Sequence, residues 1–125
     1  MIWGARIAIL LVGLFSLAMG LMALGSPVQL GMTLGIGALT PMGLNSLRAD
    51  LGAFFLASAI ASILALFFGR SVWMWGVACL YGLAVLGRFL GIALEGAPEG
   101  IAQPVTIELV LVVLSVYGAR TLGRS

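Results

Sequence analysis

The sequence predicts an all-α integral membrane protein in which four membrane-spanning helices form an antiparallel bundle. Two observations support this prediction. Hydrophobic residues occupy 62% of the 125 positions and charged residues only 8%, whereas a typical soluble domain is about half apolar and about one quarter charged. Apolar stretches near the length that a bilayer crossing requires, about 20 residues, recur along the chain with short connections that favour antiparallel neighbours. We expect a single transmembrane domain over residues 1–125, with spans at residues 2–24, 47–68, 72–94 and 104–121.

The first span contains Arg6 and then an uninterrupted apolar stretch. A cleaved signal peptide is the alternative, because Ala23, Leu24 and Gly25 resemble a small-residue cleavage site. The apolar stretch is longer than that of a signal peptide, which favours a span. Residues 26–46 are apolar but are interrupted by Gly and Pro, and such a backbone cannot leave its amides unsatisfied against lipid. We expect a Gly- and Pro-rich loop there, or a short helix that lies on the interface or caps the bundle.

The second and third spans begin at recognisable signals. Asn45 or Ser46 is a suitable N-cap for the second span, and Asp50 would then lie near the positive end of that helix. Trp73 and Trp75 open the third span, and tryptophans are typical anchors at the membrane interface.

The fourth span is expected to begin at Pro104, since proline is favoured in the first helical turn. Its few polar or small residues, among them Glu108, Ser115 and Gly118, share one face, which we expect to turn inward. Helices in lipid associate through small residues that allow close backbone approach. In the other three spans, small residues recur at intervals of three or four and so share a helix face. Chance is the alternative explanation, because the chain is rich in Gly and Ala. The sets are Gly13, Ser16 and Gly20; Ala53, Ala57, Ala61, Ala65 and Gly69; and Gly87 with Gly91.

The arginines predict the orientation of the bundle. With four spans, one side of the membrane receives four arginines: Arg6, Arg70, Arg120 and Arg124. The other side receives three acidic residues: Asp50, Glu95 and Glu99. Cytoplasmic loops carry the excess of Arg and Lys. We therefore expect both termini in the cytoplasm and the protein in a bacterial inner membrane.

Ionisable residues near or within the spans form the candidate site. Such a residue costs about 2.5–3.5 kcal/mol to insert and so calls for a partner or a function. Arg88 and Glu108 have matching depths and are expected to pair. The full set of candidates near the non-cytoplasmic end is Arg48, Asp50, Tyr81, Arg88, Glu95 and Glu108. Two interpretations remain open: a salt-bridge network that fixes the helices in register, or a polar pocket that binds a lipid headgroup or a small ligand with an apolar tail.

Composition excludes several kinds of chemistry. The chain has no histidine and one cysteine, Cys79, which removes histidine-bound haem, histidine-containing zinc sites and internal disulfides. We expect no metal and no cofactor. The net charge is +2, and the arginines are too dispersed to form a nucleic-acid surface.

Several of these residues resemble a known family. Residues 45–49 at the start of a span, Gly87 and Arg88 followed by Gly91, the pair Glu95 and Gly96, and a Glu in the last span are similar to small bacterial four-helix membrane proteins catalogued as domain of unknown function 4345. The resemblance covers most of the chain from Arg48 onward, and Asp50 and Leu51 depart from its pattern. It implies the four-span architecture and a shared polar set at Arg48, Arg88, Glu95 and Glu108, but no activity. A looser similarity is to DoxX-type membrane proteins, which are four-helix proteins and often accessory to redox systems.

Three functions are compatible with these features. The first is a non-catalytic membrane protein, either an accessory subunit of a complex or a binder of lipid or another hydrophobic ligand, whose partners are lipids, other subunits or a second copy. The second is an enzyme acting on a lipid-like substrate, with Glu108 or Glu95 as general acid or base and Arg48 or Arg88 holding an anion. The third is an oligomeric transporter component.

Overall fold

The computed structural model describes residues 2–37 and 40–124, and this part of the chain is all-α. The long helices are α1 (Ile2–Gly25), α4 (Gly52–Phe68), α5 (Ser71–Glu95) and α6 (Ala102–Arg124). The short helices α2 (Pro27–Leu34) and α3 (Pro41–Ser46) follow α1, and a π-helical turn, η1 (Leu47–Leu51), joins α3 to α4. In the described part of the chain, four helical segments are long and apolar enough to cross a membrane, with Pro41–Phe68 as the second. The predicted fold class is confirmed.

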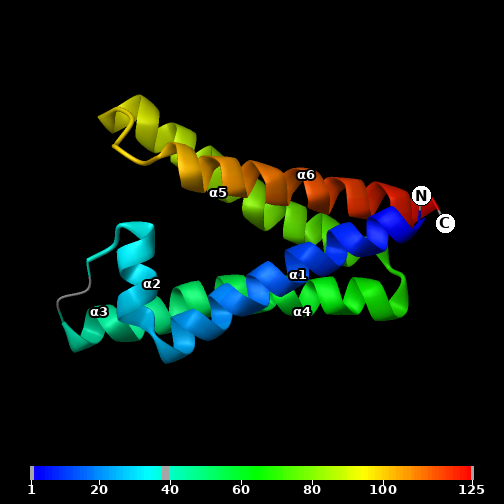
Figure 1. Ribbon diagram of the computed structural model, residues 1–125, viewed down its shortest axis with the longest axis horizontal. Coiled ribbons are helices and arrows are strands. Elements are labelled where there is room, and N and C mark those ends of the chain that lie inside the picture. Colours follow the sequence, from blue (N-terminus) through cyan, green and yellow to red (C-terminus); the bar gives the residue numbers. More distant parts are fainter. Residues whose placement is uncertain (1, 38–39, 125) are drawn as a thin grey trace.

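The helices are arranged as two antiparallel pairs (Figure 1). α1 packs along α4, and α5 packs along α6. The two pairs meet at the end where the N- and C-termini lie, and the α5–α6 pair diverges from α1, α2 and α4 towards the opposite end. We call these the closed end and the open end of the bundle.

The second membrane segment begins earlier than the sequence indicated. Thr40 is the N-cap, and its Oγ1 accepts a hydrogen bond from the Gly43 amide at 3.0 Å. Pro41 therefore starts a helix, as proline often does in the first turn, and the predicted cap at Asn45 or Ser46 is wrong. This segment has 28 residues and is about 42 Å long, against a hydrocarbon core of about 30 Å.

The segment between the first two spans does contain a short helix, α2, as one of the expectations had it. Gly35 ends α2 in a left-handed conformation with φ of 76°, which glycine adopts without strain. Gly31 lets the chain fold back closely, because a Cβ there would lie 2.8 Å from the Ile36 carbonyl oxygen.

Small residues bring α1 against α4 and α6. A Cβ added at Gly13 would lie 3.1 Å from Ser62 Cβ, and one added at Gly20 would lie 2.6 Å from a Leu56 methyl carbon. On α6, Gly118 is packed as closely against Ile9. The expected packing seam of α1 and the expected inward face of α6 are both confirmed.

The expected alanine ribbon of α4 is wrong as a packing surface. Ala53 and Ala57 are exposed, and Ala65 is the buried member of the set. A helix advances about 100° per residue, so positions four apart drift by about 40° per step and wind round the helix. The face that is buried instead comprises Gly52, Phe55, Ser58, Ala59, Ser62 and Ala65.

Candidate functional site

The ion pair between Arg88 and Glu108 is the centre of the candidate site. Arg88 Nε donates to Glu108 Oε1 at 2.6 Å, and the two side chains are 28% and 16% exposed. The antiparallel packing of α5 and α6 places the two residues opposite one another. The predicted pairing is confirmed, and it is the one ion pair in residues 2–37 and 40–124.

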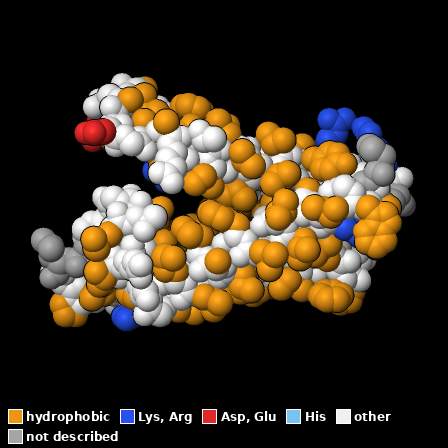
Figure 2. Space-filling model, in the orientation of Figure 1, with side chains coloured by type: hydrophobic (Ala, Val, Ile, Leu, Met, Phe, Trp, Pro, Cys, Tyr) orange, Lys and Arg blue, Asp and Glu red, His pale blue; other side chains and the backbone are white. Residues whose placement is uncertain are grey.

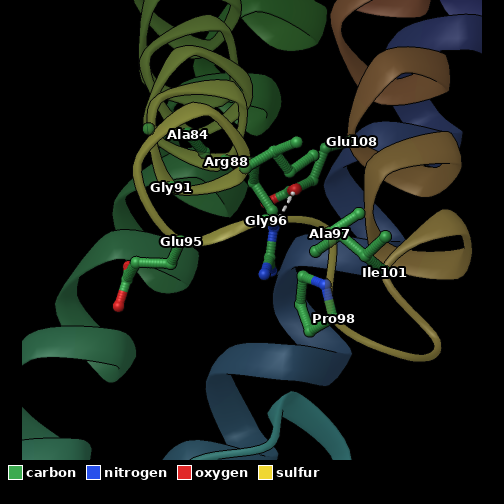
Figure 3. A pocket seen from close by; sticks show the side chains of 11 residues that line it. Ala84, Arg88, Gly91, Glu95, Gly96, Ala97, Pro98, Ile101 and Glu108 are labelled. Atoms are coloured by element: carbon green, nitrogen blue, oxygen red, sulfur yellow. Dashed lines mark hydrogen bonds and ion pairs between the residues drawn. The ribbon is translucent and has the colours of Figure 1, made fainter.

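A pocket of about 620 Å³ surrounds this pair at the open end (Figure 3). Its walls come from the last three turns of α5, the turn that follows, and the first part of α6: Ala84, Gly87, Arg88, Gly91, Ile92, Glu95, Gly96, Ala97, Pro98, Ile101 and Glu108. Figure 2 shows that the molecular surface is hollowed between the end of the α5–α6 pair and the segment below it. The pocket is therefore open at the surface of the bundle.

Two glycines of α5 widen this pocket. Gly87 and Gly91 were expected to pack against another helix, but a Cβ added at either would meet no atom within 4 Å. That expectation is wrong, because no helix covers this face of α5 in the described part of the chain. The glycines leave the Arg88 side chain accessible from the open side instead.

Most hydrogen-bond donors of the Arg88 guanidinium have no partner in the described residues. It has five N–H donors, and within the described residues the bond from Nε to Glu108 is the one that it makes. In Figure 3 its terminal nitrogens point away from Glu108, towards the side of the pocket where Pro98 lies. These terminal N–H groups can donate hydrogen bonds to a carboxylate, phosphate or carbonyl oxygen from outside the protein.

Glu95 lines the same pocket but does not join the ion pair. Its carboxylate points away from Arg88 and Glu108 in Figure 3, and it is exposed. The pocket thus has a cationic donor group within it and a separate carboxylate at its edge.

Arg48 and Asp50 lie elsewhere. Both are exposed on η1, and neither lines the pocket. Arg48 Nε donates to the Leu24 carbonyl oxygen at 3.1 Å, in the last turn of α1, where a cation also interacts favourably with the helix dipole. The structure therefore brings three of the five predicted charged residues to one place and leaves these two outside it.

Tyr81 lies beneath the pocket in the core. It is 1% exposed, and its hydroxyl is 2.6 Å from that of Ser16. Each long helix contributes at least one fully buried hydroxyl to this part of the core: Ser16 from α1, Ser58 and Ser62 from α4, Tyr81 from α5 and Ser115 from α6. Tyr81 therefore links helices and does not line the pocket.

Sequence reasoning did not identify the turn residues of the pocket. Ala97, Pro98 and Ile101 form part of its wall, and Gly96 and Gly100 turn the chain there with φ of 86° and 82°. Nothing in the spacing of these residues indicated that they would lie beside Arg88.

The chemical repertoire of the site is one guanidinium with free donors, two carboxylates and an apolar surround. In the described residues, no group of three or more His, Cys, Asp or Glu side chains could hold a metal ion. Comparison with protein-family models, with curated proteins and with solved structures found no match to this chain.

Proposed function

We propose that this protein is a non-catalytic membrane protein that binds a lipid-like ligand in the pocket of α5 and α6. The main support for the proposal is that the terminal N–H groups of Arg88 have no hydrogen-bond partner in the described residues and face an open pocket. A cation at this depth in a bilayer needs acceptors for its donors. The polar headgroup of an amphipathic ligand supplies them.

The rest of the pocket suits the apolar part of such a ligand. Ala84, Gly87 and Gly91 form a small-residue face, along which a hydrocarbon chain could lie against the helix. Arg88 is two turns before the end of α5, about 10 Å along the helix axis. A headgroup at Arg88 would thus lie near the membrane interface, with its chain directed towards the bilayer interior.

The same proposal includes the orientation of the protein. Arginines gather at the closed end, where both termini lie (Figure 2): Arg6, Arg70, Arg120 and Arg124. The preference of such residues for the cytoplasmic side supports cytoplasmic termini in a bacterial inner membrane. The ligand pocket would then face the non-cytoplasmic leaflet.

A second candidate function, an accessory subunit of a membrane complex, is favoured by a different observation. Gly76 of α5 lies on the same side of the helix as the two pocket glycines, and like them it would meet no atom within 4 Å if it carried a Cβ. Glycines in membrane helices commonly mark helix–helix contacts, so this face of α5 suits a helix from another subunit. Co-purification of a second membrane protein that is lost in a Gly76→Leu variant would favour this function over ligand binding.

Native mass spectrometry of protein released gently from its own membrane tests the ligand proposal. We expect the wild type to retain a small amphipathic molecule that the Arg88→Gln variant loses. Arg48→Gln is the matched control, because it removes the same charge at the same end of the bundle, outside the pocket. A wild-type protein that carries no ligand would contradict the proposal, as would equal retention by the Arg88→Gln variant.

A further inference from the structure

A second groove follows the C-terminal half of α6, at the closed end of the bundle. Its volume is about 530 Å³, and every residue that lines it belongs to α6: Val112, Val113, Val116, Tyr117, Arg120, Thr121 and Arg124. The groove is apolar along its first two turns and basic at its end. It shares no residue with the pocket around Arg88.

Tyr117 forms a fixed part of this groove. A Cβ added at Gly4 would lie 2.6 Å from the Tyr117 hydroxyl oxygen, so the absence of a side chain at Gly4 lets the tyrosine lie against the first turn of α1. Tyr117 is 37% exposed, which leaves part of it available to the groove. The groove therefore has a wall that is held by a neighbouring helix and is more than a bare helix surface.

The basic end of the groove has no acidic partner. Arg120 and Arg124 are exposed, and neither forms an ion pair in the described part of the chain. Residues four apart lie on the same side of a helix, about 6 Å apart along its axis. Both guanidinium groups can therefore approach one anion.

The charge distribution along the molecule leaves these arginines uncompensated. The chain has four acidic residues, and in the described structure each of them lies at or near the open end: Asp50 in η1, Glu95 at the end of α5, Glu99 in the following turn and Glu108 in the first half of α6. Glu108 is 12 residues before Arg120, or about 18 Å along the helix. No acidic side chain of the described residues therefore lies near Arg120 and Arg124 to supply an anion.

We propose that the groove on α6 is a binding site for an anionic phospholipid. The phosphate lies between Arg120 and Arg124, because guanidinium groups bind phosphate oxygens through charge-assisted hydrogen bonds. One acyl chain lies along Val113 and Val116, which continue the groove towards the middle of the bilayer. The site belongs to the leaflet at the closed end, so it is separate from the proposed ligand pocket in position and in headgroup chemistry.

The test uses the full chain in nanodiscs that contain equal amounts of phosphatidylglycerol and phosphatidylcholine. Native mass spectrometry then counts the lipids that stay bound after the disc is removed. We expect the wild type to retain phosphatidylglycerol in preference to phosphatidylcholine. An Arg120→Gln/Arg124→Gln variant should lower that retention about tenfold, which corresponds to about 1.4 kcal/mol of binding free energy.

Two further variants distinguish binding in the α6 groove from a general attraction between basic residues and anionic lipid. Arg6→Gln/Arg70→Gln removes the same charge from the same end but leaves the groove intact, and it should retain phosphatidylglycerol as the wild type does. Val113→Trp keeps both arginines and places a large ring in the groove; Val113 is 64% exposed, so the fold should tolerate it. This variant should lose phosphatidylglycerol.

Three results would overturn the proposal. One is a wild type without preference for the anionic lipid. Another is an equal loss in the Arg6→Gln/Arg70→Gln control, which would reduce the effect to general attraction between basic residues and an anionic leaflet. The last is unchanged retention in Val113→Trp, which would show that the groove takes no part in binding.

Discussion

The two ends of this bundle are held together by different interactions. At the closed end, the lack of a side chain at Gly118 allows α6 to approach α1 so closely that an added Cβ would lie 2.7 Å from Ile9 Cγ1. In the core between the two ends, all four long helices contribute buried hydroxyls, and the contact between Ser16 and Tyr81 joins α1 to α5. At the open end, a Cβ added at Gly87 or Gly91 of α5 would meet nothing within 4 Å, and the one ion pair of the described chain joins α5 to its own neighbour α6.

This difference explains why the α5–α6 pair diverges from α1 and α4 at the open end, where Arg88 and Glu108 lie. The ion pair of Arg88 and Glu108 connects two helices that are already joined by a short turn. It adds no link between this pair and α1 or α4. Shape complementarity between small residues holds the two pairs together only at the closed end, which leaves a pocket at the other.

The largest loss of stability is expected from a substitution that adds a side chain to the tight contact at the closed end. In a Gly118→Leu variant, the new side chain would begin 2.7 Å from Ile9 Cγ1, so α1 and α6 must move apart. Overpacking of this kind costs typically 1–3 kcal/mol, and we expect about 3 kcal/mol here because backbone must move. Unfolding by denaturant in detergent measures the loss of stability. Gly82→Leu, at a position with open space around it, is the control and should change stability little; an equal loss there would refute the distinction between the two ends.

The next largest effect is expected at the ion pair. Glu108→Gln leaves the partly buried Arg88 without a negatively charged partner, and we expect a loss of about 2 kcal/mol, below the 3–5 kcal/mol typical of fully buried pairs. Restoring neutrality with the Arg88→Gln/Glu108→Gln double variant should recover part of this loss. Denaturant unfolding of the three variants measures the coupling. Strictly additive losses would mean that the two side chains do not stabilise one another.

A smaller effect is expected for the hydroxyl contact in the core. Tyr81→Phe removes the 2.6 Å contact with Ser16 and keeps the ring, including its edge-on contact with Phe54 at 5.3 Å between centroids. Hydrogen bonds between membrane helices contribute about 0.6 kcal/mol on average and about 1.7 kcal/mol at most, so we expect a loss of about 1 kcal/mol. A double-mutant cycle with Ser16→Ala checks this, and a coupling energy of zero would show that the contact contributes nothing to stability.

The sequence was sufficient for the fold class and for the pair Arg88 and Glu108. Spans follow from the length and composition of apolar stretches, and the pairing follows from the similar depths of two charged residues on helices joined by a short turn. The start of the second segment was misplaced because Pro41 is compatible both with a loop and with the first turn of a helix.

Which small residues pack could not be read from spacing alone. Gly20 and Gly87 both occur in small-residue sets at helical spacing, yet a Cβ at the first would collide with Leu56 and a Cβ at the second would meet nothing. The difference depends on how the two helix pairs diverge, which is a property of the whole bundle. The same divergence places Arg48 against the end of α1, outside the pocket that the sequence suggested it would share.

The smallest effect on stability is expected from a substitution that fills the open end. In a Gly87→Leu variant the new Cβ would meet no atom within 4 Å, and we expect the rest of the side chain to extend into the pocket beside Arg88. Leucine also favours helix over glycine by up to about 1 kcal/mol. Stability should therefore be unchanged or slightly higher. If the pocket binds a lipid-like ligand, however, the leucine occupies the space of its chain and the retained molecule should disappear in native mass spectrometry. Loss of ligand without loss of stability would establish that the open end is shaped for binding, because a gap that only reflects loose packing would carry no ligand to lose.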